Sequence, residues 1–273
     1  MSTHGDFPPN PLEKPGYLLE FHDEFDGDRL NTDHWLPFYL PQWSSRERSA
    51  PRYTLQNQTL ILQIAADQAP WCPEFDGEVK CSSLQTGVFA GPVGSTSGQH
   101  RFKPACVVRE AQTTQRTYTP QYGYFETRVK VRQTAGNLAA LWMIGFEEAP
   151  EESGEIAVFE VFGDQMTDAT AEVRYGVHPW QDATLTDEFY RDVLPIDAAQ
   201  FHIYAVEWTP THIDFYVDNV KRRTIHQSPA YPMQFMLGMY ELPHTDPTVG
   251  RYPKQFIVDY FRGYQPENGY PQA

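Results

Sequence analysis

The sequence is built from short segments in which apolar and polar residues alternate, separated by turns that contain glycine or proline. Alternation with a period of two predicts β-strands, and no stretch keeps a helical period over three turns. The expected strands are residues 17–21, 58–64, 122–131, 138–145, 153–163, 171–178, 201–208, 213–218, 233–240 and 255–264. Strands at this spacing predict an all-β fold, a β-jelly-roll sandwich of two antiparallel sheets. Acidic residues inside the strands are then expected on a concave face, which forms a substrate cleft.

No break in composition divides the chain, so we expect one domain over residues 17–273. Residues 1–16 are rich in proline and glycine and predict an arm that lies on the surface of this domain. Residues 66–104 are dense in proline, glycine and serine, and a loop of this length inside a compact domain is usually functional or flexible. We expect it to border a binding cleft.

Charge limits the partners of the chain. Its 36 acidic and 21 basic residues give a net charge of −15, which argues against nucleic acid or an anionic membrane as a partner and favours a neutral ligand. The sequence contains no run of 18 apolar residues, so it predicts no membrane-spanning helix. Residues 1–7 lack the basic and apolar regions of a signal peptide, which indicates a cytoplasmic protein, or an extracellular one whose leader has been removed. We expect a monomer.

The three cysteines, Cys72, Cys81 and Cys106, make an odd count. A disulfide between Cys72 and Cys81 would close a short loop, but three thiols without a leader favour free cysteines. Their spacing does not resemble a zinc site.

Two glutamates, Glu155 and Glu160, lie in one strand-type segment that begins and ends near glycine. In a regular strand, side chains five residues apart face opposite ways. A β-bulge between them would bring both carboxylates to one face. Two carboxyl groups about 5 to 5.5 Å apart are the arrangement of a retaining glycosidase, with one as nucleophile and one as acid/base. The alternative is a buried strand with one outward glutamate and no chemistry.

Five segments, taken in order, resemble glycoside hydrolase family 16, the family of laminarinases, lichenases and carrageenases. They are residues 21–27 (FHDEFDG), 122–128 (YGYFETR), 138–143 (LAALWM), 201–218 (a hairpin that begins FHIYAVEWTP) and 258–264 (VDYFRGY). The resemblance runs from about residue 17 to 265. It implies a concanavalin-like jelly roll.

The signature of that family is E-x-D-x-x-E, and the matching residues here are Glu155, Ala157 and Glu160. The resemblance implies that Glu155 is the nucleophile and Glu160 the acid/base. Ala157 stands where the family has a supporting aspartate. The protein is therefore a slower enzyme, an enzyme in which another group supplies the support, or a binding module.

The activity implied by the resemblance is retaining endo-hydrolysis of a β-linked polysaccharide, with β-1,3-glucan as the expected substrate. Two alternatives remain open. A lectin-like glycan-binding module is favoured by Ala157, and a transglycosylase would use the same carboxylates while excluding water from the second step.

Further candidates for substrate binding follow from the resemblance and from side-chain chemistry. Trp142 is expected on the cleft floor, or in the ordinary core. His178 is expected beside the acid/base, or as a structural histidine. Trp180 and Trp43 are candidate platforms for stacking on sugars. Arg46 lies where the family often contacts a sugar, and its loop is equally consistent with one pinned to the body of the protein.

No cofactor is expected for catalysis. Asp259 matches a family position that binds a structural calcium, so the resemblance implies a possible calcium there. Calcium needs 6 to 8 oxygen ligands, and a single carboxylate supplies only a small part of them.

Overall fold

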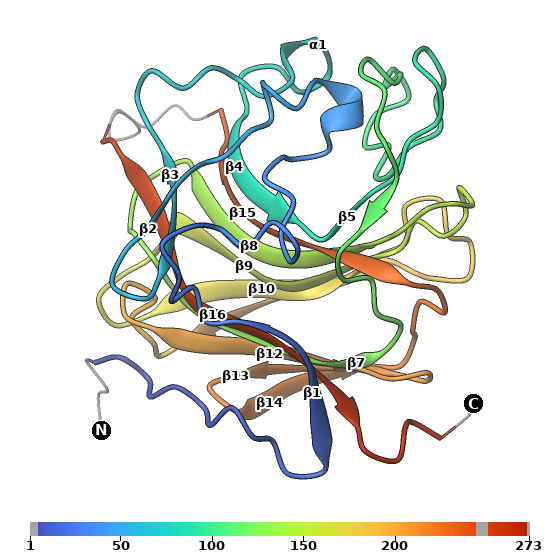
Figure 1. Cartoon of the computed structure of the whole chain (residues 1–273). Coiled ribbons are helices and arrows are strands. Elements are labelled where there is room, and N and C mark those ends of the chain that lie inside the picture. The colour runs from blue at the N-terminus through green and yellow to red at the C-terminus, as the bar shows by residue number, and fades with distance from the viewer. Residues whose placement is uncertain (1–4, 244–250, 272–273) are drawn as a thin grey trace.

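Two antiparallel sheets pack face to face in the computed structural model, which describes residues 5–243 and 251–271 (Figure 1). No helix in these two ranges is long and apolar enough to cross a membrane. The arrangement confirms the expected jelly-roll sandwich.

The outer sheet has eight strands, in the order β14-β13-β12-β7-β16-β3-β2, with β1 paired to β16. Their bounds are β1 Tyr17–Asp23, β2 Arg52–Leu55, β3 Leu60–Ile64, β7 Gly123–Val131, β12 His202–Trp208, β13 Ile213–Val217, β14 Val220–Ile225 and β16 Lys254–Pro266.

The inner sheet has six strands, in the order β11-β10-β9-β8-β15-β4. Their bounds are β4 Lys80–Gln85, β8 Asn137–Gly145, β9 Glu155–Met166, β10 Ala171–His178, β11 Glu188–Leu194 and β15 Met233–Glu241. The remaining short elements are η1 Pro41–Trp43, α1 Pro73–Asp76, β5 Gly87–Val88 and β6 Gln115–Arg116.

The core lies between the two sheets and is rich in aromatic side chains. Phe159 of the inner sheet stacks on Tyr204 of the outer sheet, with ring centroids 4.3 Å apart, and both are buried. Every residue of β15 is buried, because the core covers one face of this strand and the segments between β1 and β7 cover the other. Figure 1 shows those segments above the inner sheet, and some of their residues line a cleft there.

The sequence prediction missed strand β4, which lies inside the presumed long loop 66–104. Its sequence KCSSLQ does not alternate apolar and polar residues. Ser82, Ser83 and Gln85 are fully buried and satisfy their side chains by hydrogen bonds, for example Ser82 Oγ to the Gln63 carbonyl at 2.7 Å. Strands β2, β11 and β14 were also missed; each lies at a sheet edge, where charged residues interrupt the apolar pattern.

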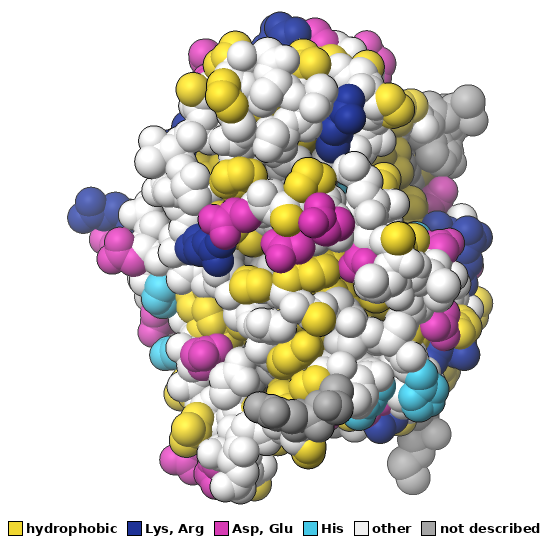
Figure 2. Space-filling view, turned by 90° about the vertical axis from the view of Figure 1, so that its right-hand side faces the viewer, with side chains coloured by type: hydrophobic (Ala, Val, Ile, Leu, Met, Phe, Trp, Pro, Cys, Tyr) yellow, Lys and Arg dark blue, Asp and Glu magenta, His cyan; other side chains and the backbone are white. Residues whose placement is uncertain are grey.

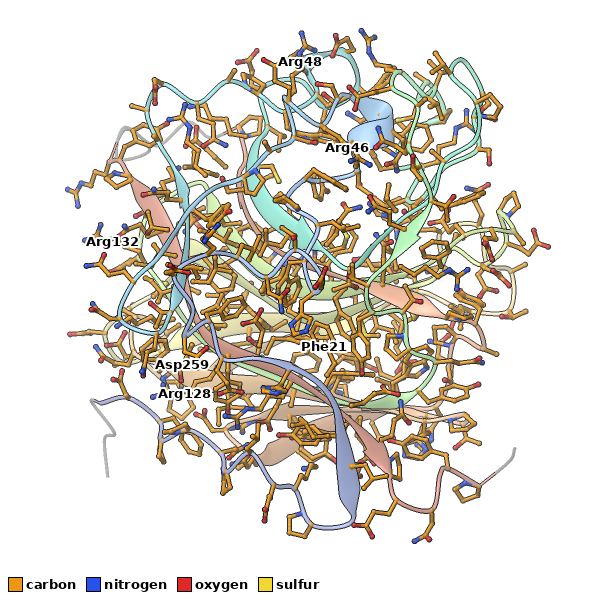
Figure 3. The ribbon with its side chains drawn as sticks, viewed as in Figure 1. Phe21, Arg46, Arg48, Arg128, Arg132 and Asp259 are labelled. Carbon is orange, nitrogen blue, oxygen red and sulfur yellow. The ribbon has the colours of Figure 1, made fainter. Side chains whose placement is uncertain are left out.

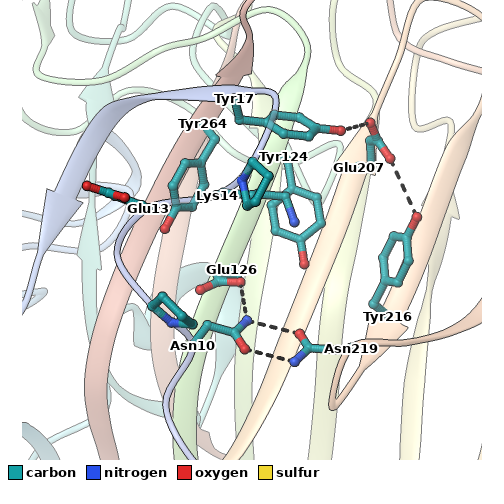
Figure 4. A pocket seen from close by; sticks show the side chains of 12 residues that line it. Asn10, Glu13, Lys14, Tyr17, Tyr124, Glu126, Glu207, Tyr216, Asn219 and Tyr264 are labelled. Atoms are coloured by element: carbon teal, nitrogen blue, oxygen red, sulfur yellow. Dashed lines mark hydrogen bonds between the residues drawn. The ribbon is translucent and has the colours of Figure 1, made fainter.

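Residues 5–16 lie along the outer sheet, as Figure 4 shows in part. The Asn10 amide donates to Glu126 Oε2 at 2.8 Å and exchanges hydrogen bonds with the Asn219 amide. The Lys14 ammonium lies 3.6 Å from the centre of the Tyr124 ring, a cation–π contact. These contacts attach the arm to β7 and to the β13–β14 turn.

All three cysteines are free and buried, as expected, and no Cys72–Cys81 disulfide forms. Burial raises the pKa of the Cys72 thiol to about 11 and raises that of Cys106, so both are protonated at neutral pH.

Candidate active site

Strand β9 contains the expected β-bulge. On the β8 side, Phe159 pairs with Leu141 and Ala157 pairs with Trp142, so Val158 is an extra residue. On the β10 side, three steps along β9, from Glu160 to Ala157, match two steps along β10. The extra residue resets the alternation of side chains, and Glu155 and Glu160 both line one cleft on the inner sheet. The alternative of a strand with one outward glutamate is therefore wrong.

The cleft has a volume of about 300 Å³ and is lined by acidic, aromatic and apolar side chains. The lining residues are Tyr39, Asp76, Val79, His100, Leu138, Ala140, Trp142, Glu155, Glu160, His178, Trp180, Tyr240 and Leu242. No lysine or arginine of the described chain belongs to this lining. The negative charge of the carboxylates is therefore balanced by His178, by hydrogen bonds and, for Glu160, by Arg174 and Arg191 from outside the lining.

Glu155 is buried at the start of β9, and burial raises its pKa to about 7. Two neighbours act against this effect: the charge of His178 and the indole N–H of Trp180, which donates to Glu155 Oε2 at 2.7 Å. Burial also raises the pKa of Glu160, again opposed by His178. The negative charge of Glu160 itself raises the pKa of Glu155, so the two carboxyl groups are coupled. The pair is suited to hold one proton near neutral pH.

Trp180 reaches Glu155 because β10 ends at His178 and the chain then turns. The backbone of Trp180 has a φ of 47°, in the left-handed region, and its side chain is 46% exposed. The indole therefore presents its N–H to Glu155 while part of the ring remains open to the cleft. This position suits the expected stacking on a sugar.

His178 lines the cleft and pairs with Glu155 in the β10–β9 register. Its Nδ1 lies 2.5 Å from Asp187 Oδ1, and its ring stacks on Phe189 at 4.5 Å between centroids. The Asp187 carboxylate fixes the orientation of the imidazole, as a carboxylate does for many histidines that handle protons. The sequence pattern gave no indication of Asp187.

Trp142 lies on the cleft floor, 7% exposed, with its indole N–H donated to the Tyr240 hydroxyl at 3.0 Å. Trp142 thus lines the cleft and also packs in a buried apolar cluster, so both interpretations describe its position, and a contact with sugar stays a prediction. Asp76, Val79 and His100 come from the 66–104 segment, so that segment does border the cleft. Which of its residues do so was not predictable, because no motif marks them.

Two expected sugar contacts lie elsewhere. Trp43 is fully buried, and its indole N–H donates to the Gln99 carbonyl at 2.9 Å, so the prediction of an exposed stacking platform is wrong. Arg46 bonds Gln112 Oε1 at 2.9 Å and stacks over Phe38, and it is not among the cleft residues (Figure 3). The loop that carries Arg46 is therefore held against the body of the protein, which was the second interpretation of this loop.

Asp259 does not fit a calcium site. Its Oδ2 lies 2.7 Å from Arg128 Nη1, and a guanidinium at that oxygen repels a metal cation. Figure 3 labels both residues on the outer sheet. Among residues 5–243 and 251–271, no group of three or more histidine, cysteine, aspartate or glutamate side chains is placed to hold a metal ion.

The protein is a jelly roll in which a bulge brings two glutamates into one cleft. These features define its class, proteins with the scaffold of a carbohydrate-active enzyme. A sequence profile described as glycosyl hydrolases family 16 matches residues 67–252, which is more than half of the chain. The chain belongs to glycosyl hydrolase family 16.

Two solved structures agree with this chain in fold, and a curated relative matches part of its sequence. The GlcNAcα1-4Gal-releasing endo-β-galactosidase of Clostridium perfringens is 33% identical with a TM-score of 0.85, over 97% of this chain and 67% of that one. A laminarinase catalytic domain from Thermotoga petrophila RKU-1 is 18% identical with a TM-score of 0.65, over 92% of this chain and 99% of that one. A beta-glucanase of Acetivibrio thermocellus is 31% identical over 157 residues, which are 55% of this chain and 44% of the relative. The match thus spans less than half the length of that curated relative.

Proposed function

We propose that the protein is a retaining endo-glycoside hydrolase that cleaves an uncharged glycan at a β-galactoside linkage. The observation that carries the proposal is the bulge in β9, which brings Glu155 and Glu160 into one cleft. Two coupled carboxyl groups with raised pKa values are the machinery of glycoside hydrolysis.

In the proposed mechanism, the coupled pair shares one proton, and in the reactive form this proton lies on Glu160. The ionised Glu155 attacks the anomeric carbon while Glu160 donates its proton to the leaving oxygen. A glycosyl-enzyme ester forms at Glu155. Glu160 then removes a proton from water, which attacks the same carbon and releases Glu155 with the original anomeric configuration.

Trp180 takes over part of the role of the missing aspartate. Its N–H holds Glu155 Oε2 at 2.7 Å and favours the ionised form that the nucleophile needs. His178, oriented by Asp187, adds electrostatic support to both glutamates. Ala157 is fully buried and contributes no polar group. We therefore favour an active enzyme over a binding module.

Charge supports an uncharged substrate. Sulfated or uronic sugars would meet Glu155, Glu160 and Asp76 with no lysine or arginine among the described lining residues. On the face shown in Figure 2, acidic and apolar side chains gather near the middle with a basic side chain beside them, and the chain as a whole carries a net charge of −15.

The galactoside linkage rests on likeness. The endo-β-galactosidase of Clostridium perfringens matches 97% of the chain at 33% identity. A β-glucan, the substrate expected from the sequence, is the second candidate, because a beta-glucanase is 31% identical over 55% of the chain.

The test is product release from a panel of neutral β-galactans, a glycan ending in GlcNAcα1-4Gal, β-1,3-glucan and a sulfated galactan, with Glu155→Gln in parallel. Products from a galactoside only, absent with the variant, support the proposal. Products from β-1,3-glucan only would favour the second candidate. Lengthened oligomers would indicate a transglycosylase, and binding without products would indicate a module.

A further inference from the structure

His100 lies in the wall of the cleft, beside the two tryptophans that a sugar would contact. Its ring meets Trp142 edge to face at 5.0 Å between centroids and Trp180 at 4.6 Å. It lines the same cleft as Glu155 and Glu160. No motif pointed to it, and the mechanism above gives it no role.

The backbone of His100 is held in place by Glu147, which follows strand β8 of the inner sheet. Its φ is 50°, in the left-handed region, and its N–H donates to Glu147 Oε1 at 2.6 Å. Glu147 is buried just after β8 and has a φ of 57°. A residue held in this uncommon conformation by a buried carboxyl is positioned by the fold, as functional residues often are.

The imidazole of His100 has unused hydrogen-bonding capacity. Within the described chain, neither ring nitrogen has a hydrogen-bond partner, and Nδ1 is buried without one. Burial and the charge of His178 lower the pKa of His100 to about 3, so the ring is neutral. A neutral imidazole offers one donor and one acceptor, which matches a sugar hydroxyl.

We infer that His100 is a specificity-determining residue whose outer ring nitrogen, Nε2, exchanges a hydrogen bond with a hydroxyl of the sugar held between Trp142 and Trp180. The inference rests on the proposed function, since it concerns the same cleft. It assigns part of the selection among sugars with different hydroxyl positions to one residue of the 66–104 segment. Discrimination follows because the nitrogen stays unpaired when a ligand lacks the hydroxyl.

The competing explanation is that His100 only supports Trp180 by ring contact. Three variants separate the two. His100→Phe keeps an aromatic ring but removes both nitrogens, His100→Gln keeps a donor and an acceptor near the position of Nε2, and His100→Ala removes ring and nitrogens. His226→Phe, at an exposed histidine outside the cleft lining, is the control.

The readouts are kcat and KM on a neutral β-galactan, and calorimetric binding of a β-galactan oligosaccharide to each variant in a Glu155→Gln background. We expect His100→Phe to lower kcat/KM and affinity by about 10-fold or more, and His100→Gln to stay within about 5-fold of the parent. Thermal melting checks that each variant folds.

Parent-like kinetics and binding in His100→Phe, with losses only in His100→Ala, would overturn the inference in favour of ring support. If the wild-type protein releases no product but its oligosaccharide binding falls in His100→Phe, the inference stands and the hydrolase proposal fails. Absence of both binding and hydrolysis for β-galactan would overturn the two together.

Discussion

The Trp180 indole N–H donates to Glu155 Oε2 at 2.7 Å, from the turn that follows β10, the strand next to the one that carries the glutamate. The family signature would place an aspartate at position 157, between the two glutamates, where this chain has a buried alanine. The support for the nucleophile therefore comes from a neighbouring strand end rather than from β9 itself.

Replacing Trp180 should impair catalysis and shift its pH dependence. A hydrogen bond to the ionised form lowers a carboxyl pKa, so Trp180→Phe raises the pKa of Glu155 and moves the acidic limb of the kcat/KM profile to higher pH. We expect kcat to fall about 10- to 100-fold. The measurement is a pH–rate profile.

The control is Trp208→Phe, which removes an indole of strand β12 in the outer sheet that is bonded to Ser228. It should leave the acidic limb in place. An unchanged limb in Trp180→Phe would contradict the role given to the indole.

Restoring the aspartate should matter most when Trp180 is absent. Ala157→Asp returns a side chain that can support the carboxyl groups, so in a Trp180→Phe background it should recover part of the lost activity. In the wild-type background the gain should be smaller, because Trp180 already bonds Glu155. A double-mutant cycle on kcat measures the difference. Additive effects would show that the two positions do not share a function.

The raised pKa of Glu155 should cost folding stability as pH rises. The unfolded chain ionises this group near its ordinary value, about 4.5, whereas the folded protein holds the proton until about pH 7. The unfolded state therefore binds fewer protons between these values, and the free energy of unfolding falls by up to about 1.4 kcal/mol per pH unit.

Glu155→Gln removes this dependence. Its free energy of unfolding, measured in urea, should exceed that of the wild type at pH 8 by more than at pH 4.5. Glu78→Gln, at an exposed glutamate, serves as the matched control. An equal difference at both pH values would mean that Glu155 is not destabilised by burial.

The arm over residues 5–16 should contribute to stability and not to catalysis. Asn10→Ala removes the amide that bonds Glu126 Oε2, leaving that buried carboxylate with one partner fewer. We expect a loss of about 1–3 kcal/mol in urea unfolding, with kcat/KM unchanged because the arm lies on the outer sheet. Full stability in Asn10→Ala would show that the arm is attached by other contacts.

The sequence predicted the sandwich, because it follows from local alternation, and it offered the bulge as one of two interpretations of the spacing between Glu155 and Glu160. Strand β4 was not predictable, since its buried serines and glutamine are satisfied by bonds to residues far along the chain, such as Ser83 Oγ to the Leu237 carbonyl. Trp43 was mistaken for a sugar platform, because its burial depends on loop packing around Gln99. His100 and Asp187 went unnoticed because only the folded chain brings them to the cleft.

The most direct test of the central claim is to trap the glycosyl-enzyme. A 2-deoxy-2-fluoro glycosyl fluoride, built on the glycan that the wild-type protein cleaves, slows the second step, and peptide mass spectrometry locates the label. We predict a covalent adduct on the peptide that contains Glu155, absent from Glu155→Gln, and products that retain the anomeric configuration. An adduct on Glu160, or inverted products with no adduct, would contradict it.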